Sequence, residues 1–487
     1  MSFVSTFEPR PLWAHFDRIL EIPRGSKQED RIRRHVVELA TAAGLEHHTD
    51  ATGNVIVRKP GTAGREDAPV TVLQGHLDMV NEKDSDLAHD FTSDPIRPRR
   101  EGEWLYATGT TLGADNGIGV AAMLALLGAS DVPHGPLELV FTIDEETGLT
   151  GASGLDSSLL TGRRLLNLDS EEEGDVTVGC AGGAGTVLRL PVELAPAAPA
   201  APATGTALTL RLRGLRGGHS GIDIVLQRGN AVKLLARMLA AASAAASFRL
   251  VRLEGGNKHN AIPREAEAEV LVEGDAAAFR AAVAAELAAV QAEFQSADPE
   301  MTLEIGAAAS PGRVSTPAAT ATALRVLEAL PHGVLAMSPD IPGLVETSTN
   351  VATVKLEGQT LVIGTSSRSS VGSALRAARR RITAIAELAG AAVEHGHGYP
   401  GWKPDLTSPL LGTVKAIEAE VYGREPKIVA VHAGLECGII GEKVPGMDMV
   451  SIGPQIEAPH SPNERVHIES VGRFWRVLTT VLDRVSG

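Results

Sequence analysis

The sequence predicts an α/β protein in which a domain with a mostly parallel sheet is built from both chain ends and carries an inserted α+β domain. Three observations predict this class. Apolar strand-like runs alternate with helical patterns in the first part of the chain, as in βαβ units. The composition then changes to a Pro/Ala segment, LAPAAPAAPATG, at 194–205. Beyond residue 398 the first pattern returns.

The bulk composition excludes several classes of protein. At 487 residues the chain exceeds what one hydrophobic core usually supports. The net charge of -15, with acids and bases interspersed, argues against a nucleic-acid partner, which needs a basic surface. We find no apolar stretch long enough for a membrane span and no signal-peptide pattern, so we expect a cytoplasmic protein without a membrane partner. Cys180 and Cys437 lie outside any CxxC spacing, which fits a reducing compartment.

The first part of the chain alternates between the two periodicities. Helical spacing of apolar residues is found at 12–22 and 31–43, and the small and apolar residues at 117–129 are typical of a helix packed on a sheet. Strand-like runs occupy 54–57, 70–73, 137–143 and 165–168. We therefore expect a mostly parallel sheet here.

Beyond the Pro/Ala segment the pattern changes to an α+β layer. Strand, helix, strand, strand, helix and strand are expected at 207–212, 231–242, 248–253, 266–272, 276–294 and 302–305. A similar order recurs at 317–330, 350–356, 359–363, 371–388 and 391–394. We interpret this region as an inserted domain with two related halves.

A second boundary is marked by Pro400, Gly401 and Pro404. Beyond it we expect a helix at 410–421 and short apolar runs at 428–431 and 449–452. The expected division is a first domain segment at 1–200, an inserted lid at 205–397, and a second segment of the first domain at 398–487. A cleft is expected between the two domains.

The candidate chemistry begins at LELVFTIDEETG, residues 137–148, where an apolar run ends in Asp144, Glu145 and Glu146. Open α/β sheets place their ligands beyond the carboxyl ends of their strands. One glutamate could bind a metal while its neighbour moves protons. The alternative is that the acids begin a solvated turn.

Four further candidates follow strands or lie in loops. His76 and Asp78 end the strand VTVLQG, and Asp169 ends the strand in LLNLDSEEEG. His460 lies in the loop EAPHSPNE. Asp78 is placed to orient the imidazole of His76 from behind.

Each of these signals has an ordinary alternative. Asp115, in TTLGADNGIG before a helix, is also typical of an N-cap, and His460 of a loop histidine without a function. The run Glu171 to Glu173 favours a solvated acidic face. Taken together, two histidines and three carboxylates without thiolate suit Zn, Mn or Co, and five ligands hold two ions if one carboxylate bridges them.

The chain resembles the M20 family of metallopeptidases, and within it the aminoacyl-histidine (Xaa-His) dipeptidase branch. The resemblance rests on motifs in the family's order and separations: GHLDMV, GADNGIG, DEETGLTG, NLDSEEEG, GGHSG, HAGLECG and APHSPNE. It covers nearly the whole chain and shows no departure at the metal-binding or base positions.

The resemblance implies a role for each residue of this cluster. Asp115 would bridge two metal ions, most simply Zn with Mn or Co as alternatives. His76 and Asp169 would complete one site, and Glu146 and His460 the other. Asp78 would support His76, and Glu145 would be the general base and acid. In this family the bridging aspartate precedes a cis peptide, so Asp115–Asn116 is expected to be cis.

The inserted domain would contribute substrate contacts. His219, in RGGHSG, would stabilise the tetrahedral oxyanion. Arg368, in GTSSRSS, is a candidate for binding the substrate's C-terminal carboxylate. Asn260 is a further substrate candidate. In the second segment of the first domain, Glu436, in HAGLECG, is a candidate partner for a free substrate amine or, alternatively, a helix cap.

These expectations describe a metal-dependent dipeptidase that hydrolyses unblocked dipeptides, including those of the carnosine-like Xaa-His type. One alternative is an N-acyl amino acid amidohydrolase of the same family, and another is a non-catalytic binding protein on this fold. The sequence leaves open whether the protein forms a homodimer and whether His219 serves its own active site or that of a partner subunit.

Overall fold

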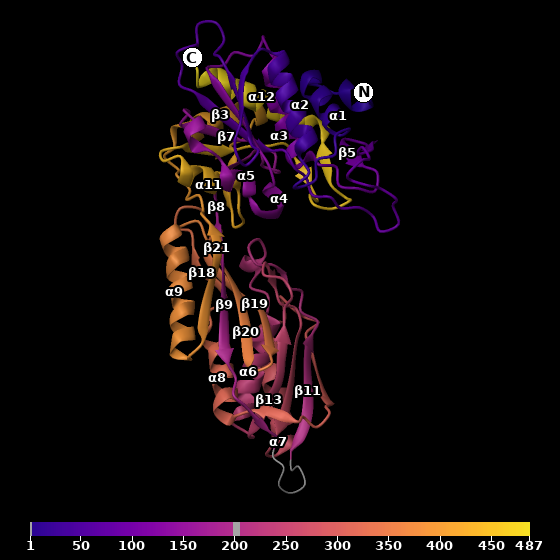
Figure 1. Ribbon diagram of the computed structural model, residues 1–487, viewed down its shortest axis with the longest axis vertical. Coiled ribbons are helices and arrows are strands. Elements are labelled where there is room, and N and C mark those ends of the chain that lie inside the picture. The colour runs from indigo at the N-terminus through magenta and orange to yellow at the C-terminus, as the bar shows by residue number, and fades with distance from the viewer. Residues whose placement is uncertain (1, 198–204) are drawn as a thin grey trace. The chain divides into compact units, whose positions relative to one another are not determined.

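The computed structural model describes residues 2–197 and 205–487, and the chain folds into two compact units (Figure 1). Unit 1 comprises Met1–Gly179, Trp402–Ala430 and Leu435–Gly487. Unit 2 comprises Cys180–Gly401 and Val431–Gly434. This connectivity is the predicted one: one domain is built from both chain ends, and the other is inserted into it.

The core of unit 1 is an eight-stranded sheet with the order β1-β2-β6-β3-β7-β23-β8-β22. Its strands are β1 (Glu46–Thr49), β2 (Val55–Lys59), β3 (Thr71–His76), β6 (Leu137–Thr142), β7 (Arg164–Asn167), β8 (Asp175–Cys180), β22 (Lys427–Val431) and β23 (Asp448–Ser451). Strands β6, β3, β7 and β23 are mutually parallel, whereas β2 and β8 join them antiparallel. The predicted α/β class with a mostly parallel sheet is confirmed.

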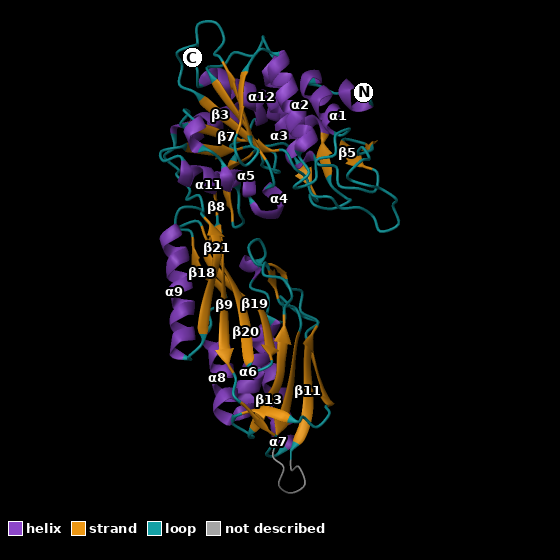
Figure 2. Ribbon diagram, viewed as in Figure 1, coloured by secondary structure: helices purple, strands orange, loops and turns teal. Residues whose placement is uncertain are grey.

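Helices and a small second sheet surround this core (Figure 2). The helices are α1 (Arg10–Ile19), α2 (Asp30–Ala42), α3 (Ala114–Gly128), α4 (Glu145–Gly148), α5 (Thr150–Gly154), α10 (Pro409–Tyr422), α11 (Glu436–Lys443) and α12 (Ile468–Arg484), with 3-10 turns at Phe3–Thr6 and Ser157–Leu159. The second sheet has the order β24-β25-β5-β4, from Ile456–Glu457, Arg465–His467, Trp104–Ala107 and Pro98–Glu101.

Helix α3 is the central helix of unit 1. Every residue from Ala114 to Leu127 is buried, because the helix packs between α1 and strand β3. An apolar surface on all sides is what such a position requires. The stretch 117–129 was predicted to be a helix on a sheet, and the structure forms this helix from Gly117 onward, after a kink at Asp115 and Asn116, whose backbone angles are not helical.

Unit 2 is built on a nine-stranded antiparallel sheet with the order β16-β11-β15-β13-β19-β20-β9-β21, and β18 pairs with β19. The strands are β9 (Gly182–Pro191), β11 (Thr206–Arg213), β13 (Phe248–Gly255), β15 (Ala266–Val272), β16 (Thr302–Ala307), β18 (Gly333–Met337), β19 (Val345–Glu357), β20 (Thr360–Ser369) and β21 (Ala392–Tyr399). Its helices are α6 (Ala231–Ser243), α7 (Ala276–Glu293), α8 (Pro317–Ala329) and α9 (Gly372–Leu388), with a 3-10 turn at Ile224–Leu226. Side chains along β15 alternate between buried and half-buried, because one face of the sheet packs on these helices.

The sheet of unit 2 has the same arrangement of strands on both sides of the β13–β19 pair. On one side β13 is followed by β15, β11 and β16, and on the other β19 is followed by β20, β9 and β21. Each half has the chain order strand, helix, strand, strand, helix, strand. This topology supports the interpretation of two related halves.

Strand β9 explains why the first boundary lies at Gly179 and not near residue 200. The strand precedes the Pro/Ala segment in the chain, yet it pairs with β20 and β21 and supplies the first strand of the second half. Within the expected connector, Leu194–Pro196 forms strand β10, which pairs with β17 (Arg313–Ser315). Residues 198–204 of that connector lie outside the described residues. The second boundary falls after Gly401, within the expected Pro/Gly segment.

Two short strands complete unit 2: β12 (Gly218–His219) and β14 (Ala261–Ile262), which pair antiparallel. Among the described residues, no helix combines the length and the apolar character that crossing a membrane requires.

Candidate metal centre

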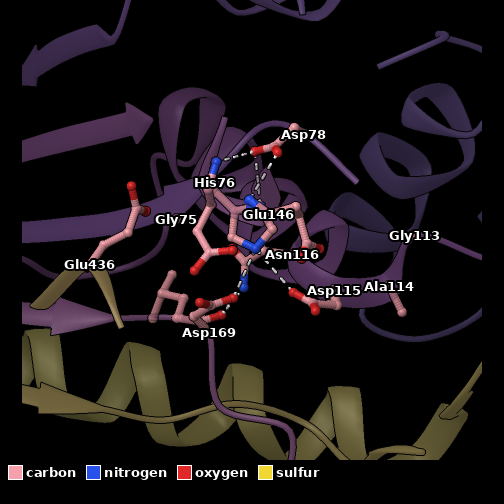
Figure 3. A network of polar contacts seen from close by, with 12 residues as sticks. Gly75, His76, Asp78, Gly113, Ala114, Asp115, Asn116, Glu146, Asp169 and Glu436 are labelled. Carbon is pink, nitrogen blue, oxygen red and sulfur yellow. Dashed lines mark hydrogen bonds and ion pairs between the residues drawn. The ribbon is translucent and has the colours of Figure 1, made fainter. Parts of the chain in front are cut away.

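Three neighbouring parallel strands of unit 1 deliver the predicted ligands to one edge of the sheet. Strand β3 ends at His76, β6 ends just before the turn that carries Glu145 and Glu146, and β7 ends two residues before Asp169. Because β6, β3 and β7 run parallel, their carboxyl ends meet at the same edge. Figure 3 shows how His76, Glu146 and Asp169 converge.

Asp115 lies between the two predicted histidine ligands. Its Oδ1 is 3.0 Å from Nε2 of His76, and its Oδ2 is 3.2 Å from Nε2 of His460. Each oxygen of one carboxylate therefore faces a different imidazole, which is the arrangement of a bridging ligand.

The remaining ligands fall into two groups that share Asp115. His76 Nε2 is 3.2 Å from Oδ1 of Asp169, and His460 Nε2 is 3.0 Å from Oε2 of Glu146. In each group one ligand atom per residue lies within 4.8 Å of the others. All five residues predicted to bind metal are thus brought together, in the two sets that the sequence resemblance implied.

The donor atoms fit divalent cations. Two ligands at the usual distance of about 2.0–2.2 Å from a common zinc ion lie roughly 3–3.5 Å apart, close to the nitrogen–oxygen distances between these side chains. Glu146 Oε1 is buried and has no hydrogen-bond partner among the described residues. A buried carboxylate oxygen without a donor is costly unless a cation compensates it.

Exposure distinguishes the two groups. The side chain of His76 is 1% exposed, whereas that of His460 is 52% exposed. In the group around His460 only the histidine is exposed, since Glu146 is 4% exposed, and the group around His76 and Asp169 is enclosed.

Asp78 holds His76 from behind, as predicted from their spacing. Its Oδ1 is 3.3 Å from Nδ1 of His76, so Nε2 points toward Asp115 and Asp169. Asp78 also accepts hydrogen bonds from the backbone N–H groups of Glu145 and Glu146, at 3.0 and 3.2 Å. Burial acts to raise the pKa of Asp78, but hydrogen bonds and the charge of His76 lower it to about 2.

The peptide bond Asp115–Asn116 is cis, which confirms the prediction drawn from the family resemblance. The alternative interpretation of Asp115 as an N-cap does not describe its side chain, because Oδ1 faces His76 and Oδ2 faces His460. The side chain of Asn116 is directed to the sheet, where Nδ2 donates to the carbonyl of Leu168 at 2.6 Å.

Glu145 begins helix α4 beside the metal ligands and is close enough to form a further overlapping group with His76 and Glu146. Burial raises the pKa of Glu145 well above its ordinary value, and the charges of Asp169 and Glu436 raise it further. Such a carboxyl group holds a proton readily, which suits proton transfer.

The acids of this turn do not form a solvated turn. Asp144 is buried, has a left-handed backbone, and accepts hydrogen bonds from the hydroxyls of Thr147 and Thr150. Glu29 accepts the backbone N–H of Asp144 at 3.1 Å. Asp144 and Glu29 shape the turn, and their oxygens are occupied by protein donors.

Three residues that the sequence reasoning did not assign lie against this centre. Glu464 and Arg24 are buried and hold the backbone around Asp115. Glu171 is half-buried, and burial together with the charges of Asp115 and Asp169 raises its pKa to about 8. The interpretation of 171–173 as a solvated face holds only for Glu172. Glu464 lay within the motif APHSPNE, which was the one available signal for it.

Glu436 also belongs to unit 1. Its Oε2 accepts hydrogen bonds from Gln74 Nε2 and Thr142 Oγ1, both at 2.6 Å, and its side chain does not cap α11. The residue has no exposed surface, and burial raises its pKa to about 7. Oε1 has no hydrogen-bond partner among the described residues.

Unit 2 gathers the other predicted substrate residues. The backbone pairing of His219 with Ala261 places Asn260 beside the histidine loop, and the carbonyl of Asn260 accepts the N–H of Ser220 at 2.8 Å. Arg368 Nη2 lies 3.5 Å from His219 Nε2. These three residues therefore belong to one cluster.

Comparison with known proteins agrees with this geometry. Residues 72–484 match the model of peptidase family M20/M25/M40. The chain belongs to the M20 peptidase family. The cytosol non-specific dipeptidase of Escherichia coli (strain K12) is 41% identical over 488 aligned residues, which cover 100% of this chain and 99% of that protein.

Solved structures give the same result. The aminoacylhistidine dipeptidase from Vibrio alginolyticus has a TM-score of 0.92 and 41% identity to this M20 peptidase, with 99% of this chain and 98% of that chain covered. The aminopeptidase PepT from Bacillus cereus ATCC 10987, at 17% identity and a TM-score of 0.57, covers 99% of this chain and 100% of its own, and shares the fold.

We predict that metal binding releases protons at neutral pH. Hydrogen bonds with Asp115 and Glu146 raise the pKa of His460 to about 11. Burial opposes protonation of His76, yet the charge of Asp169 and hydrogen bonds to its neighbours raise its pKa well above the ordinary value. Both imidazoles therefore carry protons near pH 7 in the metal-free protein and must lose them to bind metal. The affinity for Zn²⁺ should rise with pH through the neutral range.

Calorimetric titration of metal-free protein with Zn²⁺ in buffers of different ionisation enthalpy measures these protons. His460→Asn, which removes one of the two histidines, should release fewer. Binding without proton release at pH 7 would contradict the prediction.

Proposed function

We propose that this M20 peptidase is a dinuclear metal-dependent dipeptidase that hydrolyses unblocked dipeptides, Xaa-His dipeptides among them. The observation that carries the proposal is Asp115, whose two oxygens face two different histidines at 3.0 and 3.2 Å. The choice of dipeptides is supported by the relatives that are named cytosol non-specific dipeptidase and aminoacylhistidine dipeptidase. We place the reaction in the cytosol, as the name of the first relative does.

We assign two divalent ions to the centre, most simply Zn²⁺, with Mn²⁺ or Co²⁺ as alternatives. His76 and Asp169 would hold one ion, Glu146 and His460 the other, and Asp115 would contact both. Imidazole and carboxylate donors suit all three metals. When bound, such ions act as Lewis acids and lower the pKa of a shared water to about 7.

Glu145 is the general base and acid in this proposal. It lies next to the ligand groups without being needed in either, and its backbone is held by Asp78 at 3.0 Å. As a carboxylate it takes a proton from the attacking water, and the carboxyl so formed delivers that proton to the leaving amine.

His219 would donate a hydrogen bond to the oxyanion. Its Nδ1 accepts the N–H of Ile222 at 3.1 Å, which leaves the proton of a neutral imidazole on Nε2. Burial and the charge of Arg368 lower the pKa of His219, so the ring is neutral at pH 7. A neutral ring with a fixed Nε2–H donor suits an oxyanion.

Arg368 would bind the C-terminal carboxylate of the substrate. It is buried, Nη1 donates to Tyr399 at 3.0 Å, and no carboxylate among the described residues lies within ion-pair distance of it. Its Nε has no hydrogen-bond partner among the same residues. A buried guanidinium without an acid is strongly favoured to bind an anion. Asn260, in the same cluster, is a further candidate for substrate contact.

We propose that Glu436 favours a free substrate amine. Because its carboxylate is completely covered, it would act on the substrate ammonium through its negative charge and not by direct contact. An N-acyl amino acid amidohydrolase, the nearest alternative, has no use for such a charge, since its substrates carry no ammonium group.

The first prediction of this proposal concerns the blocked amine. Metal-free protein reconstituted separately with Zn²⁺, Mn²⁺ and Co²⁺ should hydrolyse a free dipeptide such as β-alanyl-histidine. N-acetylation should lower kcat/KM by about 10- to 100-fold, which corresponds to the loss of an attraction of about 1.4–2.7 kcal/mol between the ammonium and the buried carboxylate. Preference for the acetylated substrate would favour the amidohydrolase, and absence of hydrolysis with all three metals would favour a binding protein.

The second prediction concerns the base. Glu145→Gln should lower kcat by about 10²- to 10⁴-fold, because it removes proton transfer and nothing else. Its content of bound metal, measured by elemental analysis, should equal that of the unaltered protein. Glu172→Gln, an exposed acid on a neighbouring turn, is the control and should keep full activity. Full turnover in Glu145→Gln would exclude this residue as the base.

The third prediction concerns His219. His219→Ala should lower kcat by about 10²- to 10³-fold with unchanged metal content, because it removes one oxyanion donor. His259→Ala removes an exposed histidine near the same hairpin and should be silent.

Mixing His219→Ala with Glu145→Gln protein tests which subunit the histidine serves. We expect no recovery of activity, because both halves of unit 2 lie in one chain. Recovery would mean that His219 acts on the site of a partner subunit.

A further inference from the structure

We infer that Glu464 is a positioning residue of the metal centre, which fixes the bridging carboxylate of Asp115 relative to His460. The inference rests on the proposed dinuclear centre and adds a residue that touches neither the expected metals nor the substrate. It concerns unit 1 alone.

The carboxylate of Glu464 accepts hydrogen bonds from the backbone N–H groups of the loop that carries Asp115. Glu464 Oε2 accepts the N–H groups of Leu112 and Gly113, at 2.8 and 2.9 Å. Glu464 Oε1 accepts those of Ala114 and Asp115, at 2.7 and 3.3 Å. The partners are about 350 residues apart in the chain, and Glu464 is 2% exposed. Each charge-assisted hydrogen bond of this kind is stronger than a neutral one.

The same loop is held from its other side by Arg24. The guanidinium donates to the carbonyl of Gly113, and also to the carbonyls of Leu77 and Asp78, at 2.9 and 2.7 Å. The N–H of Gly113 thus donates to the carboxylate of Glu464, and its carbonyl accepts from the guanidinium of Arg24. Burial lowers the pKa of Arg24, and the charge of Glu464 acts to raise it.

Gly113 permits this close approach. Its backbone is left-handed, with φ of 69°, and a Cβ there would lie 2.5 Å from Arg24 Nη2 and 2.8 Å from Met79 Sδ. A side chain at this position would push the guanidinium away.

Glu464 also terminates the loop that carries His460. The N–H of Glu464 donates to the carbonyl of Ser461 at 3.0 Å, and Ser461 Oγ donates to the carbonyl of Ala458 at 2.8 Å, so the loop between these residues is closed by its own hydrogen bonds. Three residues separate His460 from Glu464. The two ligands that face each other at 3.2 Å are therefore mounted on loops that Glu464 joins.

This arrangement predicts a specific weakness when the carboxylate is changed. In Glu464→Gln one acceptor oxygen becomes an NH₂ group, which would face backbone N–H groups that are also donors. The loop would lose half of its anchoring and Asp115 would move relative to His460. Outer groups that orient metal ligands typically contribute about 10- to 100-fold in metal affinity.

A matched control separates positioning from general stability. Glu138 is a second buried carboxylate that accepts backbone N–H groups, those of Thr161 at 3.0 Å and Gly162 at 3.1 Å. It lies on β6 near the strand's start, away from the edge that carries the ligands. Glu138→Gln should therefore destabilise the fold without changing the metal centre.

The experiment measures Zn²⁺ affinity by competition with a chromophoric chelator, thermal stability, and kcat and KM for a free dipeptide. In Glu464→Gln the more weakly bound of the two Zn²⁺ ions should have an affinity about 10- to 100-fold lower. The fall in kcat should be larger than the change in KM. Glu464→Asp keeps an acceptor carboxylate one methylene shorter, is expected to fold, and should show a smaller loss. The Co²⁺-loaded variants should show an altered absorption spectrum, which a purely structural change elsewhere would not produce.

The inference would be overturned if the unaltered protein, Glu464→Gln and Glu464→Asp had equal Zn²⁺ affinities and spectra. It would also be overturned if Glu138→Gln lost as much Zn²⁺ affinity as Glu464→Gln. Failure of the unaltered protein to bind two Zn²⁺ ions would instead overturn the proposed centre, and the inference with it.

Discussion

The structure of the centre depends on the contact of one carboxylate with two imidazoles. Asp115 can face His76 with one oxygen and His460 with the other only if its backbone is held rigidly, because a small rotation would break one of the two contacts. Helix α3 supplies a fully buried base for that backbone. Glu464 and Arg24 hold the loop just before it. The bridging geometry is therefore a property of the packed core and not of the ligand alone.

The excess of buried carboxyl groups around the ligands explains why the site favours bound cations. Besides the ligands, the carboxyls of Glu145, Glu436 and Glu464 are buried nearby, and burial raises the pKa of the last two to about 7. So many acids in a small volume repel one another and are poorly solvated. In the metal-free protein protons reduce that cost. Two divalent ions would replace the protons and stabilise the carboxylates in the arrangement that the fold imposes.

Sequence periodicity predicted the sheet class and most helices, and it placed His76, Glu146 and Asp169 after strands whose ends meet at one edge. The grouping of Asp115 and His460 with them was implied by the family resemblance, because one precedes a helix and the other lies in a loop. It did not predict the place of strand β9, since a strand's partners are set by tertiary contacts and not by its own pattern. Arg24 and Glu464 were also outside its reach. Their roles consist of hydrogen bonds to backbone groups, which are identical at every residue, so no periodicity in the sequence marks the partner, and the motif APHSPNE contains Glu464 without indicating what it binds.

The two clusters differ in sign, and the proposed dipeptide substrate carries charges of both signs. The centre in unit 1 has an excess of buried acids, including Glu436, whose charge no described base balances through an ion pair. The cluster in unit 2 has the guanidinium of Arg368 and the imidazole of His219, whose Nη2 and Nε2 atoms lie 3.5 Å apart. A dipeptide carries an ammonium at one end and a carboxylate at the other. An N-acyl amino acid offers only the carboxylate, and would give the charge of Glu436 no ammonium group to attract.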